Sequence, residues 1–355
     1  MRLPSVRLPV VLGFLAAGSL FLALPPARAD LVWNATGGWT IEGGALSGLT
    51  GEEGRNALDL MNKARASEEK GSLRRAGKTY EEVARKYPNS IYSPEALYRA
   101  GKVFLAHKEY YRSFQDFQGV LDRYPNTKRF NEIIGEEYHI ASALLDGAHS
   151  RFFFGMFPGF ASRERALGYF EVVLANAPYS DYAPLALMNI ANGHQKFSNI
   201  PEGIDALDRM INYYPQSLLT PDAYLKLGQI NAALVDGPEY DQAATRDAIT
   251  YFEDFMILFP GDPNVPLAEK GLADMKTVLA ESKIKMADFY FYKRDNYTAA
   301  RVFYNEAITD YPDSPIAAVA KKRLEQVEAK AAGKPAPADT PAPEGVKKKK
   351  RFWLF

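Results

Sequence analysis

A four-residue phrase with proline in second place recurs six times, and this recurrence constrains the fold of the chain more than any other feature. Its fourth residue is Ser, Thr or Asp, and the copies begin at Tyr87, Tyr124, Ala177, Tyr214, Phe259 and Tyr311. The six prolines are 37, 53, 37, 45 and 52 residues apart. These intervals fit a unit of about 37 residues that carries three insertions, and a period in this range is typical of helical repeat proteins.

Each proline follows a segment with one helical pattern. A small residue lies twelve positions before the proline, a large apolar residue eight before it and another apolar residue five before it, as Ala76, Tyr80 and Val83 do before Pro88. These steps keep the three positions on one face of a helix. Proline then ends the helix, because it disfavours the α conformation of the residue before it and has no backbone N–H to donate.

The residues after the phrase predict a second helix in each unit. In four copies another proline follows after six residues, which suits the first turn of a helix. Seven residues later comes Gly or Ala, as at Gly101 and Gly228, which predicts a close approach between helices. The predicted helix pairs are 56–70 with 73–87, 94–107 with 110–124, 130–146 with 162–176, 184–196 with 201–214, 221–235 with 243–259 and 266–292 with 296–311, and a closing helix spans 315–331.

This layout is that of tetratricopeptide repeats, slightly longer than usual. One helical hairpin cannot bury its apolar face alone, so neighbouring hairpins stack on one another. We therefore expect an all-α fold, an α-solenoid of about six hairpins and a capping helix over 56–331. Such a stack is expected to form a right-handed superhelix with a concave groove that binds other proteins.

The start of the chain predicts export. Residues 1–29 combine early arginines, an apolar run at 10–24 and a closing Ala-Arg-Ala, which predicts a secretory signal peptide cleaved before Asp30. A membrane-anchoring helix is disfavoured, because the apolar run is shorter than the roughly 20 residues that a bilayer requires. Residues 30–55 are rich in glycine and contain two tryptophans. We expect this segment to be irregular, with its tryptophans docked on the first repeat or on a partner.

The end of the chain changes character twice. Residues 332–346 are typical of a flexible Pro/Ala linker, and 347–355 form a basic, aromatic tail. Positive charges followed by aromatic side chains favour either a membrane surface or the groove of a partner protein, with a tail of no role as the third alternative. The residues that would make this contact are Lys347, Lys348, Lys349, Lys350, Arg351, Phe352, Trp353 and Phe355.

Composition and motifs exclude several functions. The chain has no cysteine, so it can form no disulfide, thiolate metal site or lipid-modified cysteine. Its net charge is zero overall and −7 over 30–331, which disfavours nucleic acid as the main partner. Glu136 and His139 have a spacing that metal sites use, but only one such pair is present. No nucleophile–base pair or phosphate-binding loop occurs, so we expect a non-catalytic protein without metal or cofactor.

Three segments resemble one family. Residues 87–127, which begin "YPNSIYSPEALYRAGKVFL", 286–328, which contain "NYTAARVFYNEAITDYPDS", and the insertion at 152–180 are similar to the outer-membrane lipoproteins of the BamD type, also called YfiO. The resemblance implies a periplasmic scaffold of the machinery that assembles outer-membrane β-barrels. The chain departs from the family in lacking the lipidated cysteine, in having six helix pairs where five are typical, and in its basic tail.

The resemblance also implies where partners would bind. Early repeats would receive unfolded outer-membrane proteins, and the candidate contacts for these clients are Tyr98, Phe104, Tyr110, Tyr111, Phe152, Phe153, Phe154 and Phe157. For all of them the alternative is packing within the protein, since aromatics at helical spacing are usually core. Late repeats would dock on the barrel-forming subunit, and the candidates there are Phe289, Tyr290, Tyr292, Lys293 and Arg294, because aromatic residues and arginine are favoured at interface centres.

A second function remains open on the sequence. Periplasmic repeat adaptors that link cell-division or peptidoglycan-synthesis factors share the repeat pattern. Some of them begin with a coiled coil, and no apolar heptad run is present at 30–55, which counts mildly against this alternative. Both functions place the protein in the periplasm. For the assembly scaffold we expect a peripheral position at the outer membrane, without a lipid anchor.

Overall fold

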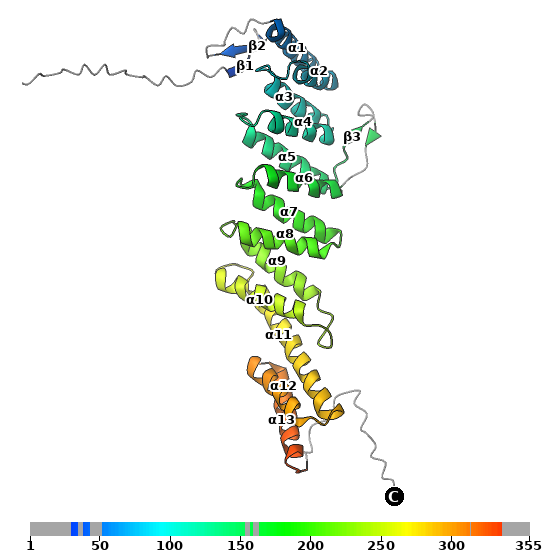
Figure 1. The fold of residues 1–355 in the computed structure, drawn as a ribbon, viewed down its shortest axis with the longest axis vertical. Coiled ribbons are helices and arrows are strands. Elements are labelled where there is room, and N and C mark those ends of the chain that lie inside the picture. The colour runs from blue at the N-terminus through cyan, green and yellow to red at the C-terminus, as the bar shows by residue number, and fades with distance from the viewer. Residues whose placement is uncertain are drawn as a thin grey trace, which may run out of the picture. The chain divides into compact units, whose positions relative to one another are not determined.

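The computed structural model describes residues 30–34, 38–42, 52–152, 157–158, 163–312 and 314–335, and within these ranges the fold is helical. Thirteen α-helices and one π-helix make up this described part, with two short strand pairs beside them (Figure 1). The predicted all-α repeat fold is thus confirmed. The chain divides into two compact units, one ending at Thr127 and the other beginning at Lys128.

The first unit contains two helical hairpins. Its helices are α1 (Glu52–Glu69), α2 (Leu73–Lys86), α3 (Ser93–Ala106) and α4 (Tyr110–Arg123). Within this unit α1 packs on α2, α2 on α3 and α3 on α4. Their boundaries agree with the predicted pairs except that α1 begins four residues earlier than position 56.

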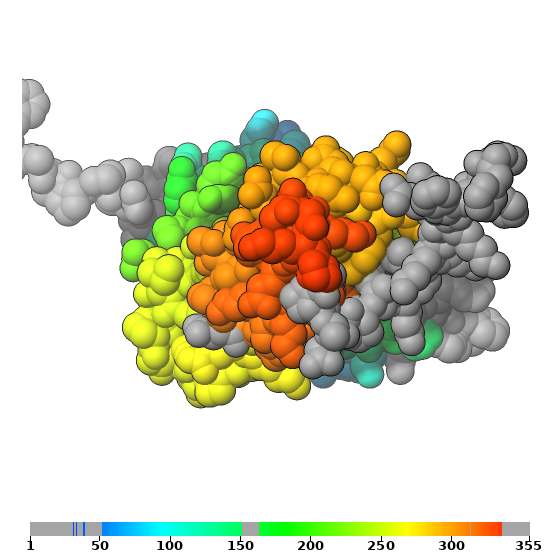
Figure 2. All heavy atoms as spheres, turned by 90° about the horizontal axis from the view of Figure 1, so that it is seen from below, coloured from blue at the N-terminus to red at the C-terminus, as the bar shows by residue number. Residues whose placement is uncertain are grey.

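The second unit continues the pattern. Its helices are α5 (Phe130–Leu145), α6 (Arg163–Asn176), α7 (Tyr182–Lys196), α8 (Ile200–Tyr213), α9 (Thr220–Ala233), α10 (Ala243–Leu258), α11 (Val265–Asp288), α12 (Tyr297–Asp310) and α13 (Pro315–Ala331). The closing helix α13 packs mainly on α12 and also contacts α11; Figure 2 shows this end of the molecule, with α13 in red. Among the described helices none is long and apolar enough to cross a membrane.

The proline phrase is a hydrogen-bonded joint between hairpins. In the first copy, the Tyr87 backbone N–H donates to the Val83 carbonyl and the Ser90 N–H donates to the Tyr87 carbonyl, so the helix end is satisfied. The aromatic residue before the second proline also has a role, because the Tyr124 hydroxyl donates to the Pro88 carbonyl at 2.7 Å. The same bond recurs between Tyr214 and Pro178 at 2.6 Å. At these two places the phrase links a hairpin to the one before it.

The start of the described chain corrects the expectation of an irregular segment. Strands β1 (Asp30–Asn34) and β2 (Gly38–Glu42) pair antiparallel, with Trp33 opposite Trp39. Trp39 is only 2% exposed and its backbone N–H donates to Asn62 of α1 at 2.9 Å. An isolated two-stranded hairpin is barely stable in water. This hairpin is held by its contact with the first repeat. Its strands are too short to show an alternating pattern in the sequence, and they form because of that tertiary contact.

A second difference lies at the end of α11. The predicted helix 266–292 is α-helical only to Asp288, and Phe289–Lys293 form a π-helix, η1. Single π turns inside helices are frequent at functional sites. Another short strand pair, β3 (Arg151–Phe152) with β4 (Phe157–Pro158), lies in the insertion between α5 and α6.

The close-packing glycines lead to a first prediction. A Cβ at Gly228 would lie 2.7 Å from the ring of Phe252, and one at Gly271 would lie 2.6 Å from the same ring. We expect Gly228→Ala to lower the free energy of unfolding by about 1–3 kcal/mol, because the added methyl group forces the buried Phe252 ring to shift. At Gly168 a Cβ would meet nothing within 4 Å, so Gly168→Ala is expected to raise stability by about 0.5–1 kcal/mol. Urea unfolding of both variants tests this, and equal effects would contradict it.

Candidate binding sites

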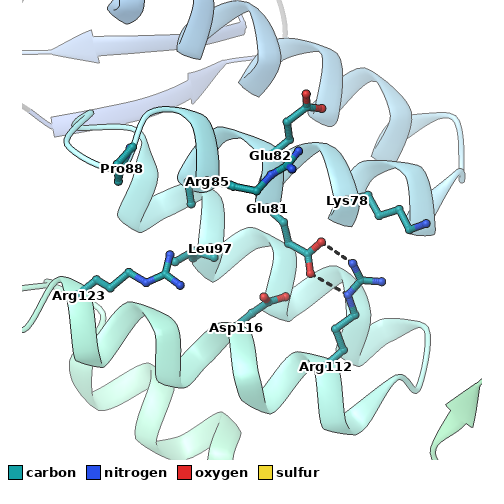
Figure 3. A pocket seen from close by; sticks show the side chains of 10 residues that line it. Lys78, Glu81, Glu82, Arg85, Pro88, Leu97, Arg112, Asp116 and Arg123 are labelled. Atoms are coloured by element: carbon teal, nitrogen blue, oxygen red, sulfur yellow. Dashed lines mark hydrogen bonds and ion pairs between the residues drawn. The ribbon is translucent and has the colours of Figure 1, made fainter.

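A charged cavity lies on one face of the first unit. Its volume is about 650 Å³, and side chains of α2 and α4 form most of its wall (Figure 3). Pro88 and Leu97 add apolar surface. The charged residues of the wall are Lys78, Glu81, Glu82, Arg85, Arg112, Asp116 and Arg123. Positions three, four or seven residues apart along a helix lie on one face, as Lys78, Glu81 and Arg85 do on α2 and Arg112, Asp116 and Arg123 do on α4.

Two of the three acids of this cavity are neutralised by neighbours. Arg112 holds Glu81 with two hydrogen bonds, one of them 2.7 Å from Nε to Oε1, and Figure 3 shows both as dashed lines. Glu82 forms an ion pair with Lys86 at 2.6 Å. By contrast Lys78, Arg85 and Arg123 are exposed and form no ion pair with any described residue. The unpaired charge of the cavity is therefore positive.

Asp116 is the unusual member of the cavity wall. It is 7% exposed, and its Oδ2 atom is buried without a hydrogen-bond partner among the described residues. Burial, and after it the charge of Glu81, raise the pKa of this carboxyl to about 8 against the opposing effect of Arg112 and Arg123. At neutral pH Asp116 is thus mostly protonated, and it can donate a hydrogen bond.

An apolar pocket lies in the second unit. It has a volume of about 600 Å³ and is formed by the loop between α9 and α10, the last turns of α11, and η1. Large side chains are exposed around it: Tyr240 is 63% exposed and Phe289 is 46% exposed, with Met286 beside them. Exposed apolar groups gathered in one place mark interaction sites more often than scattered ones do.

Firm contacts hold the walls of this pocket in place. The Tyr290 ring stacks on Phe303 of α12 with centroids 5.5 Å apart. Lys285 of α11 forms an ion pair with Glu239 of the α9–α10 loop, which ties the two walls together. Beneath the π turn, Phe291 is buried in the core that α11, α12 and α13 share. Phe289 alone of the η1 aromatics is exposed, so the π turn displays one ring on an ordered base.

Comparison with known proteins assigns the chain to a family. The profile of YfiO, described as an outer membrane lipoprotein, matches residues 161–340, which is half of the chain. The chain belongs to the YfiO family. The matched range includes the apolar pocket of the second unit. Residues 60–90 and 95–127, in the first unit, match a tetratricopeptide-repeat profile instead.

Two relatives carry a functional name. The outer membrane protein assembly factor BamD of Pasteurella multocida (strain Pm70) is 29% identical over 160 residues, which are 42% of this chain and 61% of that protein. The BamD of Xylella fastidiosa (strain Temecula1 / ATCC 700964) is 22% identical over 156 residues, which are 41% of this chain and 53% of that protein. This member of the family thus spans between half and two thirds of the length of these relatives.

Solved structures of other proteins also match this chain, two of them as follows. A tetratricopeptide repeat protein from Parabacteroides merdae is 13% identical, with 78% of this chain and all of that chain covered and a TM-score of 0.30. MamA from Desulfovibrio magneticus is 21% identical, with 60% of this chain and 98% of that chain covered and a TM-score of 0.29.

The structure corrects part of the predicted client site. Tyr98 and Phe104 are 3% and 0% exposed, because both face the interior of the α2–α4 packing, and neither can contact a client from there. Tyr110 and Tyr111, at the start of α4, are partly exposed. Phe152 and Phe157 belong to strands whose side chains are not described, and Phe153 and Phe154 lie outside the described residues.

The predicted docking residues lie closer together in the structure than the predicted client contacts do. Phe289, Tyr290 and Lys293 all line the apolar pocket, and the guanidinium of Arg294 lies 5.2 Å from the centre of the Phe289 ring. Tyr292 points elsewhere, since its hydroxyl donates to Gln326 of α13 at 3.3 Å. The signal peptide 1–29 and the tail 347–355 lie outside the described residues.

Sequence reasoning missed the charged cavity of the first unit. A signal was present, because Arg112, Asp116 and Arg123 share one face of the predicted helix 110–124. It could not be separated from an ordinary solvated face, since nothing local shows that Asp116 is buried. The described ranges hold no group of three acidic or histidine side chains suited to a metal ion.

Proposed function

We propose that this protein is a non-catalytic periplasmic scaffold of the machinery that assembles outer-membrane β-barrels, acting peripherally at the outer membrane. The observation that carries the proposal is membership of the YfiO family together with two relatives named as outer membrane protein assembly factors. The repeat fold supports it, because stacked hairpins present long surfaces that bind other proteins.

The pocket around η1 is the proposed docking site for the barrel-forming subunit. Phe289 supplies an exposed ring, and Tyr290, which is stacked on Phe303, gives that ring a firm base. Lys293 and Arg294 add positive charge at its edge. Interface energy is concentrated in a few aromatic and arginine residues that are surrounded by polar groups. This pocket has that composition.

The clients of the scaffold would be unfolded outer-membrane proteins. With Tyr98 and Phe104 assigned to the core, the proposed contact in the first unit reduces to Tyr110 and Tyr111, with the phenylalanine-rich insertion at 152–160 as a second contact. The tail 347–355 would add membrane or partner binding in place of a lipid anchor, because five positive charges precede its aromatic residues.

A substitution in the pocket tests the docking proposal. We expect Phe289→Ala to weaken binding to the soluble periplasmic part of the barrel-forming subunit by roughly 5- to 30-fold, the range for an interface anchor. The matched control is Leu267→Ala, which removes a similarly exposed apolar side chain of α11 outside the pocket. Titration calorimetry of both variants, with circular dichroism as a check on folding, gives the result. Equal affinities for the two variants would rule out this pocket as the docking site.

The alternative function, an adaptor for division or peptidoglycan factors, makes a different prediction for binding to the barrel-forming subunit. A scaffold for division or peptidoglycan factors would not be retained by the barrel-forming subunit. Affinity purification of the wild-type chain from solubilised envelopes therefore separates the two functions. Recovery of division factors without the barrel-forming subunit would favour the alternative.

A further inference from the structure

We propose that the charged cavity between α2 and α4 of the first unit is a binding site for a peptide carboxylate. Neither the family match at 161–340 nor the predicted client contacts include this cavity. The inference therefore does not depend on the docking pocket of the second unit, and it stands or falls separately.

The sign of the unpaired charge selects an anion. Glu81 and Glu82 are already held by Arg112 and Lys86, so they offer little to a cationic ligand. Arg123 and, farther along the wall, Lys78 and Arg85 form no ion pair with a described residue. A guanidinium forms paired, geometrically specific hydrogen bonds with a carboxylate. An entering carboxylate would meet that group at Arg123.

Asp116 supplies the second half of the recognition. Figure 3 shows its carboxyl between Glu81 and Arg123, in the space that α2 and α4 enclose. A buried polar atom without a partner is uncommon in native proteins and calls for an explanation. A protonated carboxyl beside a guanidinium can donate to one ligand oxygen while Arg123 donates to the other. Rotation about the last side-chain bond of Asp116 brings either of its oxygens to the ligand.

The cavity also limits the size and character of the ligand. A volume of about 650 Å³ lies within the ordinary range for ligand sites and holds a few residues of a peptide rather than a folded surface. Ala84, Pro88 and Leu97 give the cavity an apolar side. The ligand that fits is a carboxylate with apolar neighbours, either a free C-terminus or an acidic side chain.

Binding is expected to depend on pH in one direction. The charged groups that act on Asp116 are Glu81 from α2 and Arg112 and Arg123 from α4. The other charged groups of the cavity wall are Lys78, Glu82 and Arg85 of α2, while α3 contributes the uncharged Leu97. Below about pH 8 the protonated Asp116 donates to the ligand. Above that pH it is ionised and repels the ligand, so affinity falls. The ligand itself must be ionised, which holds above about pH 5.

The experiment uses three fluorescent hexapeptides on the full-length mature chain. One is apolar with a free C-terminus, the second is its C-terminal amide, and the third is that amide with one glutamate. Anisotropy is measured at pH 7 and pH 9. At pH 7 we expect the peptide with the free C-terminus or the peptide with the glutamate to bind, and the plain amide to bind at least tenfold more weakly. Whichever of the two acidic peptides binds more tightly identifies the source of the carboxylate. We also expect affinity to fall at least fivefold at pH 9.

Variants place the binding in this cavity. Arg123→Gln is expected to weaken binding at least fivefold, whereas Arg75→Gln, on the exposed part of α2 outside the cavity, leaves it unchanged. Asp116→Asn keeps a hydrogen-bond donor and cannot ionise, so its affinity should be equal at pH 7 and pH 9. The proposal is overturned if the plain amide binds as well as the acids, if Arg123→Gln matches Arg75→Gln, or if no peptide binds at millimolar concentration.

Discussion

Arg323→Met is expected to destabilise the last repeat by about 3–5 kcal/mol, because it removes one partner of a buried ion pair. Asp288, at the end of α11, accepts hydrogen bonds from the Tyr304 hydroxyl and from the Arg323 guanidinium, and all three side chains are largely buried. Burial raises the pKa of Asp288, while Tyr304 and Arg323 oppose that rise. Removal of Arg323 leaves a buried carboxylate with one partner, which is costly.

Two comparisons make this prediction specific. Lys322→Met, at the exposed neighbour of Arg323, should change stability by less than about 0.5 kcal/mol. Asp288→Asn combined with Arg323→Met should recover part of the loss, because no uncompensated charge remains. In the single variant the pKa of Asp288 rises further, so its deficit should be smaller at pH 5 than at pH 8. Hydrogen exchange of the α12 and α13 amides measures these differences. If Arg323→Met lost no more stability than Lys322→Met, the proposed role of the Asp288, Tyr304 and Arg323 contacts would be contradicted.

Asp116→Asn is expected to stabilise the first unit at neutral pH, and this is the second large effect. The pKa of Asp116 is about 8 in the folded chain and 3.8 for an ordinary aspartate. A carboxyl with a raised folded-state pKa contributes stability that is full at low pH and is lost as pH rises toward 8. Asparagine does not titrate. The stability of the variant relative to wild type should therefore rise by about 3 kcal/mol between pH 5 and pH 7.5.

The control for this prediction is on the same helix. Asp122→Asn removes an exposed carboxylate of α4, and its difference from wild type should stay nearly constant over the same pH range. Urea unfolding at several pH values, with hydrogen exchange in α3 and α4 to localise the effect, provides the measurement. A flat difference for Asp116→Asn would show that this carboxyl is ionised in the folded chain, and it would also remove the basis for the pH dependence proposed for the cavity.

The repeat fold could be predicted from the sequence because its determinants are local. The small residue at Ala76, the large one at Tyr80 and the proline at Pro88 lie within one helix and its end, so a single period contains the signal. The close-packing glycines belong to the same class, and Gly101 and Gly228 do face the rings of Phe117 and Phe252. Three of the five docking candidates line one pocket, while their role in docking stays a prediction.

Other features could be read only from the tertiary structure, because they depend on contacts between residues that are distant in the sequence. The β1–β2 hairpin exists because Trp39 packs on α1, which two five-residue strands could not reveal. Phe104 and Phe289 are both aromatics on predicted helices, yet packing buries the first and exposes the second. Asp116 resembles any surface acid in the sequence, and only the approach of α2 to α4 deprives it of water and raises its pKa. Helical period fixes which residues share a face, whereas burial and charge depend on what packs against that face.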